Sequence, residues 1–144
     1  MLWLLRHAEA EKGEPDADRP LTERGRRDAR NAGKALALLG ARIEVCLASP
    51  KARAAETARL ACEALGVEVR LADALSGEPF DPYALADDHA LLVGHDPSFS
   101  AAVHDLTGAN VRLRKGGLAA IDSGELVVLL RPTELAGIAG EKRG

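Results

Sequence analysis

The fold class can be inferred from the first nine residues, Met1-Leu2-Trp3-Leu4-Leu5-Arg6-His7-Ala8-Glu9. Its apolar run is short and ends abruptly at charged and polar residues, which predicts a buried strand of a parallel sheet that leaves the sheet at Arg6 and His7. In open α/β sheets, ligands bind at the carboxyl ends of the strands. A permanently charged Arg next to a His at that place predicts an anion-binding site centred on this strand end.

Length and composition limit the possible classes of protein. The 144 residues predict a single domain, 1–144, and with only 3% aromatic residues its core must consist mainly of Leu, Val and Ala. The formal net charge of −3 argues against a nucleic-acid or membrane binder, and the opening apolar run is too short for a signal peptide or a spanning helix. Cys46 and Cys62 form no C-x-x-C pair, so we expect buried free thiols in a cytoplasmic protein.

Apolar periodicity and turn residues predict alternating strands and helices along the rest of the chain. The polar segment 9–20 is predicted to be a surface loop. The predicted elements after it are a helix between Thr22 and Gly40, a strand at 43–48, a helix from Ser49-Pro50 to Gly66, a strand at 67–71, a short helix near 83–86, a strand at 90–94, a helix at 98–106 and a hairpin of strands at 118–121 and 125–130. This order predicts an α/β fold, a three-layer α/β/α sandwich with a mostly parallel sheet.

Capping residues set the predicted helix starts. Ser49 suits the N-cap of the second helix, with Pro50 at its first position. Asp96 and Pro97 suit the same two positions before the third helix. After the hairpin, we expect the charged tail at residues 141–143 to be frayed.

Three predicted strands end in residues that bind anions. The first ends in Arg6 and His7, the second is followed by Arg53 one turn into its helix, and the strand at 90–94 ends in His95. The carboxyl ends of parallel strands lie on one edge, so two guanidiniums, two imidazoles and two helix N-termini would face one crevice. Since Arg forks bind phosphate oxygens in pairs, this pattern predicts a phosphate site with a histidine able to act as nucleophile.

Four motifs, in this order, resemble those of the histidine phosphatase superfamily, which has the phosphoglycerate mutase-like fold. They are Leu5-Arg6-His7-Ala8-Glu9, Arg19-Pro20-Leu21-Thr22-x-x-Gly25, Ser49-Pro50-x-x-Arg53-Ala54-x-x-Thr57-Ala58 and Val93-Gly94-His95. An Arg-His pair alone is a weak signal, whereas four ordered motifs at fitting strand ends are a strong one. The short chain, without large insertions, is most similar to the SixA-type phosphohistidine phosphatases.

The resemblance implies a covalent mechanism that uses no cofactor and no metal. Neutral His7 would attack phosphorus in line to give a phosphohistidine enzyme, which water then hydrolyses. Arg6 and Arg53 would hold the phosphate oxygens, His95 would complete the cradle, and Arg19 would contact the substrate at the rim. The expected partner is a protein that carries phosphohistidine, and we expect the enzyme itself to be a monomer.

Two departures from the family pattern stand out. Ala8 replaces the family's Gly after the histidine, which an L-residue tolerates if φ is negative. The long insertion that carries an acid in larger members is absent, which leaves Glu9, Asp18, Glu78 and Asp96 as candidates for proton transfer, although each is more often a solvated or capping acid.

A protonated phosphohistidine expels neutral imidazole, whose pKa of about 6.5 makes it an easier leaving group than an alkoxide. A site without a strong acid therefore favours an N–P substrate.

Other interpretations stay open at this stage. Arg19 is about as often part of a surface salt bridge as of a substrate site, and His95 can serve as a helix cap. A metal site of His7, Glu9 and His95 is disfavoured by the two neighbouring arginines. Lys115-Gly116-Gly117 lacks Walker-type spacing and is not predicted to bind phosphate. The competing functions are hydrolysis of small phosphate esters and non-catalytic phosphate binding on the same fold.

Overall fold

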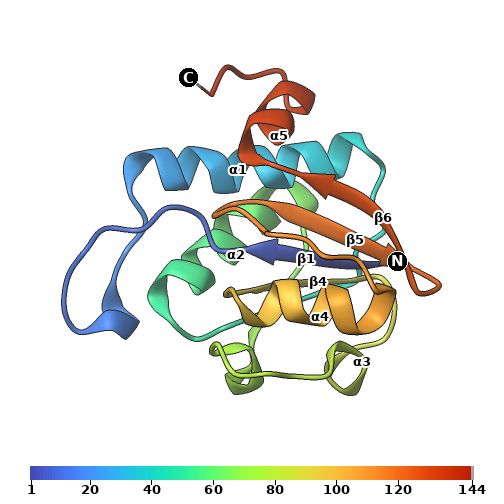
Figure 1. Ribbon diagram of the computed structural model, residues 1–144. Helices are drawn as coiled ribbons and strands as arrows, with labels where there is room; N and C mark the ends of the chain where they lie inside the picture. Colours follow the sequence, from blue (N-terminus) through green and yellow to red (C-terminus); the bar gives the residue numbers. More distant parts are fainter. Residues whose placement is uncertain (144) are drawn as a thin grey trace.

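Strand β1 (Leu2–Arg6), which contains the opening apolar run, lies inside a six-stranded sheet (Figure 1). The structure is a computed structural model that describes residues 1–143. The other strands are β2 (Val45–Ala48), β3 (Val69–Leu71), β4 (Ala90–Gly94), β5 (Leu118–Asp122) and β6 (Glu125–Leu130). The helices are α1 (Glu23–Leu38), α2 (Ala52–Leu65), α3 (Pro82–Leu85), α4 (Ser98–Thr107) and α5 (Pro132–Ile138), with short 3-10 turns at Asp16–Asp18 and Asp73–Leu75.

The order of strands in the sheet is β3-β2-β4-β1-β5-β6. The first four of these pair in parallel, and β5 runs antiparallel to both β1 and β6. In the register, Arg6 is paired with Gly94 and Ala48 with Val93. The amide of His7 continues the ladder by donating to the Gly94 carbonyl oxygen at 2.8 Å. The residues that follow β1, β2 and β4 therefore emerge side by side at one edge of the sheet.

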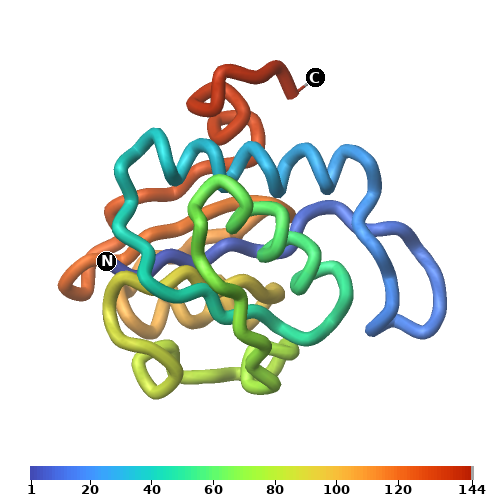
Figure 2. The backbone as a smooth tube through the Cα atoms, turned by 180° about the vertical axis from the view of Figure 1, so that it is seen from behind, coloured from blue at the N-terminus to red at the C-terminus, as the bar shows by residue number. Residues whose placement is uncertain are grey.

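Helices cover both faces of the sheet, which confirms the predicted three-layer α/β/α sandwich (Figures 1 and 2). α1, α2 and α5 pack on the face to which Trp3 and Leu5 point, and α4 packs on the other face through Phe99. Successive side chains of β1 point to opposite faces, so a strand covered on both sides is apolar throughout. Cys46 and Cys62 are buried and free in the first of these layers. No helix within residues 1–143 is long and apolar enough to cross a membrane.

Two glycines let α1 approach its neighbours closely. A Cβ at Gly33 would overlap the carbonyl oxygen of Ala61 in α2, and a Cβ at Gly25 would overlap the carbonyl oxygen of Glu9. Thr22 is the N-cap of α1, because its hydroxyl accepts a hydrogen bond from the Gly25 amide at 3.0 Å. These contacts hold the start of α1 against the segment that follows β1.

The predicted start of the second helix is wrong. α2 begins at Ala52 with Lys51 as its N-cap residue, so Ser49 is not the N-cap and Pro50 is not the first helical residue. The Ser49 hydroxyl instead accepts a hydrogen bond from the Lys51 amide at 3.2 Å, which stabilises the turn before the helix. Its side chain is fully buried, and the same oxygen lies 2.8 Å from Nε2 of His95.

Asp96 caps the third predicted helix, as expected, but it does so from one residue before the N-cap position. α4 begins at Ser98 with Pro97 as its N-cap residue, so Pro97 is not the first helical residue. The carboxylate of Asp96 accepts a hydrogen bond from the Ser100 amide at 2.9 Å. Asp96 therefore satisfies an N–H of the first turn from one position further out.

The charged tail is anchored, so the prediction that it frays is wrong for Arg143. The guanidinium of Arg143 donates from Nε to both carboxylate oxygens of Asp28, at 3.1 and 3.3 Å, and from Nη2 at 3.1 Å. Asp28 is only 2% exposed. A buried carboxylate needs a charged partner, and the chain supplies it from the far end of the sequence, where local composition gives no sign of the contact.

Candidate active site

An open pocket of about 260 Å³ lies at the edge of the sheet where β1, β2 and β4 end. The five residues predicted for the site all line it, namely Arg6, His7, Arg19, Arg53 and His95. The rest of the lining consists of Lys51, Gly77, Asp96 and Lys115. Arg and Lys side chains thus face a single carboxylate, and the pocket suits an anion.

His7 is held in one tautomer at the end of β1. Its ring Nδ1 lies 2.8 Å from the carbonyl oxygen of Ala8, and because a carbonyl only accepts, Nδ1 is the nitrogen that carries the proton. Nε2 is then unprotonated and has a free lone pair. The ring is only 6% exposed, so burial and this bond fix its orientation. A histidine in this form can act as a nucleophile through Nε2.

Thr57 of α2 holds the backbone next to His7. The Ala8 amide donates to Thr57 Oγ1 at 3.1 Å, and the Thr57 hydroxyl donates to the Arg53 carbonyl oxygen at 2.7 Å. Thr57 is fully buried, so both bonds are protected from water. One hydroxyl thus connects the segment that carries His7 to the helix that carries Arg53.

Arg6 and Arg53 reach the pocket from different elements, the end of β1 and the first turn of α2. Nη1 of Arg6 donates to the Leu113 carbonyl oxygen at 2.8 Å, while its Nε is buried and has no partner within residues 1–143. The side chain of Arg6 thus uses only Nη1 for a hydrogen bond within residues 1–143, and its guanidinium lines the pocket. Arg53 is 7% exposed and donates through Nη1 to the Asp16 carbonyl oxygen at 3.0 Å.

Asp16 is a site contact that the local sequence does not predict. Its carboxylate accepts hydrogen bonds from Arg19 Nη1 at 3.0 Å and from Arg53 Nη2 at 3.2 Å, and it lies 3.9 Å from Lys51 Nζ. The hydrogen bond from Arg19 lowers the pKa of Asp16 from its ordinary value. One exposed carboxylate therefore gathers three of the pocket's cations. Arg19 thus forms a salt bridge with Asp16, and it also lines the pocket.

His95 follows β4 and is 5% exposed. Its Nε2 lies 2.8 Å from the Ser49 hydroxyl oxygen, a hydrogen-bonding distance. The centroids of the His95 and His7 rings are 5.2 Å apart, with the ring planes tilted by 56°. Ser49 therefore orients the second histidine against the first.

The surroundings keep both histidines neutral near pH 7. Burial lowers the pKa of His7 to about 3, and nearby His95, Arg53 and Arg6 act in the same direction. Burial also lowers the pKa of His95 to about 4, with a contribution from Arg53 and Lys51. Desolvation and nearby positive charge both disfavour an imidazolium, so the neutral and nucleophilic form of His7 predominates.

A first prediction concerns the pH profile. Because only neutral His7 is nucleophilic and its pKa is lowered to about 3, its reactive form persists as the pH falls through 6.5. We expect kcat/KM for p-nitrophenyl phosphate, corrected for ionisation of the substrate, to show no inflection near pH 6.5. Any acid limb from His7 or His95 should lie below about pH 5, since kcat/KM reports the groups of the free enzyme. An acid limb centred at pH 6.5 would contradict the neutral, desolvated His7.

A second prediction concerns Asp16. Asp16→Asn removes a negative charge that lies 3.2 Å from Arg53 but keeps an oxygen that can accept hydrogen bonds. Inorganic phosphate should then bind about two- to fivefold more tightly as a competitive inhibitor, a range typical of exposed ion pairs. The measurement is the inhibition constant of phosphate in the two proteins. Weaker binding in the variant would mean that Asp16 mainly holds Arg53 in place.

The acids considered as proton donors are mostly engaged elsewhere. Asp96 lines the pocket, but its carboxylate accepts hydrogen bonds from the Ser100 amide at 2.9 Å and from the Ser100 hydroxyl, which lies 2.9 and 2.7 Å from its two oxygens. Glu9 accepts a hydrogen bond from the Thr22 hydroxyl at 2.8 Å, and the other two candidates do not line the pocket. Residues 1–143 contain no cluster of three or more His, Cys, Asp or Glu side chains that could hold a metal ion.

The fold is shared with solved structures of similar size. A proposed phosphohistidine phosphatase SixA from Agrobacterium tumefaciens is 26% identical, with a TM-score of 0.80 over 91% of this chain and 97% of that one. Another proposed SixA, from Nakamurella multipartitia, is 28% identical, with a TM-score of 0.75 over 91% and 95%. The protein histidine phosphatase SixA complexed with tungstate is 23% identical and shares the fold, with a TM-score of 0.80 over 93% and 98%.

A comparison with curated proteins found no match. A model of the histidine phosphatase superfamily (branch 1), in contrast, matches residues 2–80, more than half of the chain. The matched part contains β1 with Arg6 and His7, the loop with Arg19, and α2 with Arg53. On this match, and with a sheet and pocket arranged as described, the chain belongs to the histidine phosphatase superfamily.

Proposed function

We propose that this protein is a phosphohistidine phosphatase, which removes phosphate from a histidine of another protein through a covalent intermediate on His7. One observation carries the proposal. The His7 ring, with Nε2 unprotonated, lies in a strongly cationic pocket. The acid in the pocket lining, Asp96, is already hydrogen-bonded to Ser100. The two SixA proteins that are 26% and 28% identical are themselves proposed to be phosphohistidine phosphatases, which supports the same substrate class.

In the first step, Nε2 of His7 attacks phosphorus in line and forms a P–N bond. The P–N bond of the substrate breaks, and its electron pair goes to the leaving imidazole. Nδ1 of His7 keeps its proton because it donates to Ala8, so the phosphorylated ring is an imidazolium. Water then attacks phosphorus, and His7 leaves as a neutral imidazole with no further proton required. The Ala8 carbonyl therefore favours both steps.

The phosphoryl group would be held by the charged guanidiniums of Arg6 and Arg53. The neutral ring of His95, next to His7, would complete the binding site. Arg19 approaches from the loop at the rim. Phosphoryl transfer is catalysed mainly by positioning and by charge stabilisation of the equatorial oxygens, which this set of side chains provides.

The nature of the leaving group decides between N–P and O–P substrates. An alkoxide needs a proton donor, whereas a phosphohistidine that is already protonated releases neutral imidazole. Asp96, the acid nearest to the pocket, is committed to capping α4 through Ser100. The site therefore matches a phosphohistidine better than a phosphate ester. The alternative, a phosphatase of small phosphate esters, would need Asp96 or another acid to be released.

The openness of the pocket favours a macromolecular substrate. The two loops beside it, residues 9–20 and 73–88, are short and form no lid domain. A small metabolite gains affinity from a site that surrounds it, and this pocket does not. A histidine displayed on the surface of another protein can enter it directly.

A third prediction tests the proposal. With one enzyme preparation, kcat/KM should be higher on a phosphohistidine protein than on any small phosphomonoester tried, including sugar phosphates and phosphoglycerates. A phosphomonoester that is hydrolysed more efficiently than every phosphohistidine protein would overturn the assignment and direct attention to Glu9, Glu78 and Asp96. Absence of turnover on both classes would support non-catalytic phosphate binding, which the presence of His7 beside two arginines disfavours.

A further inference from the structure

Three basic side chains stand exposed at one side of the pocket. Arg112, Arg114 and Lys115, here called the basic ridge, flank the buried Leu113. The chain has no acidic residue from 106 to 121, and none of the three side chains forms an ion pair within residues 1–143. In a protein of net charge −3, this is a local and unbalanced excess of positive charge.

The basic ridge is fixed to the catalytic segment through its backbone. The Leu113 carbonyl oxygen accepts from Arg6 Nη1 at 2.8 Å. The Gly116 amide donates to the Arg6 and His7 carbonyl oxygens at 3.1 and 2.9 Å, and the Arg6 amide donates to the Gly117 carbonyl oxygen at 3.0 Å. These bonds place the ridge at a set position beside the pocket, whose lining includes Lys115.

Next to the ridge lies a hollow of about 160 Å³ that is lined in part by leucine side chains. It is lined by Arg112, Leu113, Arg114, Leu129, Leu130 and Arg131. Leu129 is 48% exposed, and Arg131 is neutralised by two hydrogen bonds to the Glu134 carboxylate, at 2.9 and 2.8 Å. The free charge at the hollow therefore belongs to Arg112 and Arg114.

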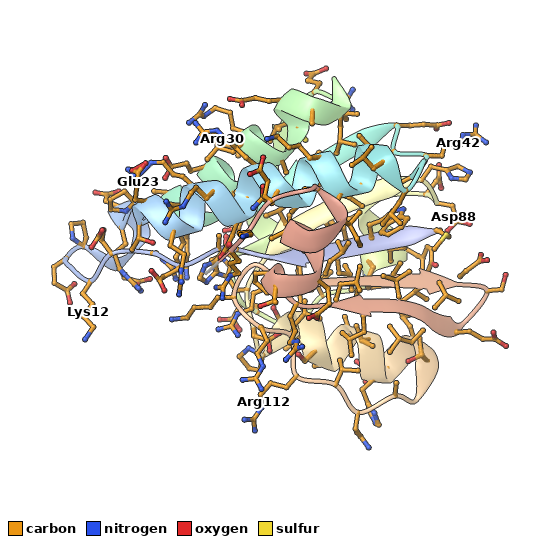
Figure 3. The ribbon with its side chains drawn as sticks, turned by 90° about the horizontal axis from the view of Figure 1, so that it is seen from above. Lys12, Glu23, Arg30, Arg42, Asp88 and Arg112 are labelled. Carbon is orange, nitrogen blue, oxygen red and sulfur yellow. The ribbon has the colours of Figure 1, made fainter. Side chains whose placement is uncertain are left out.

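The two sides of the pocket differ in how their cations are balanced. On the side of the loop at residues 9–20, Arg19, Lys51 and Arg53 share the Asp16 carboxylate. On the side of the ridge, no acidic side chain within residues 1–143 forms an ion pair with Arg112, Arg114 or Lys115. Figure 3 shows Arg112 projecting from the molecule, away from Arg42 and Asp88. An anionic partner at the ridge would thus displace no internal ion pair.

We propose that the basic ridge and its hollow form the docking surface for an acidic patch of the substrate protein, beside its phosphohistidine. This inference rests on the proposed function and adds a recognition element outside the pocket. Complementary charge at a rim accelerates association and weakens with salt, while the chemical step is unchanged. The ridge therefore acts on kcat/KM for acidic substrates and leaves the hydrolysis of small substrates alone.

The test compares two enzymes on two peptides. The peptides share one sequence around a histidine phosphorylated with phosphoramidate, and they carry either Glu or Gln at the flanking positions. Wild-type enzyme should prefer the Glu peptide by about tenfold in kcat/KM, and the preference should shrink as salt rises. The double variant Arg112→Glu/Arg114→Glu should lose the preference, while its turnover of p-nitrophenyl phosphate stays within about twofold of wild type. Lys115 is left intact because it lines the pocket.

The control is Arg42→Glu/Arg70→Glu, which changes the net charge by the same amount at exposed positions away from the ridge. This control should keep the preference for the Glu peptide. The docking proposal fails if wild type does not distinguish the peptides or if the ridge variant still prefers the Glu peptide. Failure of the proposed function is a separate outcome, in which wild type hydrolyses p-nitrophenyl phosphate but neither phosphohistidine peptide.

Discussion

Replacing His7 by alanine should lower kcat by about 10⁴-fold or more, because the group that forms the covalent bond is lost. The fold should persist, since β1 is held by backbone pairing to β4 and β5 and the His7 ring lies beyond the end of the strand. Circular dichroism and thermal unfolding of His7→Ala check the fold. His104→Ala, at an exposed position of α4, is the matched control and should keep full activity.

The covalent intermediate gives this prediction a second readout. Brief exposure of wild-type enzyme to a ³²P-labelled substrate should leave label on the protein that is stable to alkali and lost in acid, as a phosphoramidate bond is. The label should be absent from His7→Ala and present in His104→Ala. An active His7→Ala protein, or one that still traps acid-labile label, would exclude His7 as the nucleophile.

Removing Arg53 should cost about 2–4 kcal/mol of transition-state stabilisation, a loss of about 30- to 1000-fold in kcat/KM, as for other preorganised donors at developing charge. The residue is 7% exposed and packed beside Asp16, so its charge acts where water is largely excluded. Arg6→Ala should have an effect of the same size. Arg53→Lys should recover part of the loss because it restores the charge but not the planar fork.

The control for charge is Arg30→Ala, an exposed residue of α1 whose partner is Glu63 of α2. Its kcat/KM should stay within about twofold of wild type, as expected for a surface ion pair. Activity should also persist in a chelator, because arginines take the place of a metal in this mechanism. A loss of activity in EDTA that a divalent ion restores would contradict it, as would an Arg53→Ala protein with full kcat/KM.

The strand ends of the site were predictable because several local signals agree there. The apolar runs before Arg6 and before His95 are short and each is followed by polar residues, so the positions of β1 and β4 follow from the local sequence. Gly66 ends α2 in the left-handed conformation that favours glycine. The turn at Ser123-Gly124 forms the predicted hairpin between β5 and β6. Parallel pairing then brings Arg6 and His95 to the same edge.

The contacts that orient these residues depend on tertiary structure and were not predictable. Ser49 has the right chemistry for an N-cap, yet its hydroxyl binds His95 because β2 and β4 are neighbours. Asp16 reaches Arg53 only after the loop folds over α2. Thr57 belongs to a recognised motif, but its hydrogen bond to the Ala8 amide joins residues that are 49 positions apart. Each of these side chains has several plausible local partners, and the fold selects one.

The order of strands in the sheet also bears on how the protein is made. β1 is synthesised well before its two neighbours in the sheet, β4 and β5. Until Leu118 has emerged, one edge of this apolar strand lacks its partner, and exposed edges of that kind are sites of aggregation and chaperone binding. The nascent chain also lacks the hydrogen bonds from Gly116 and Gly117 that fix the backbone of Arg6 and His7. A nascent chain that has not reached Gly117 therefore carries Arg6 and His7 without the backbone contacts that hold them at the pocket, and the pocket assembles only after that residue has emerged.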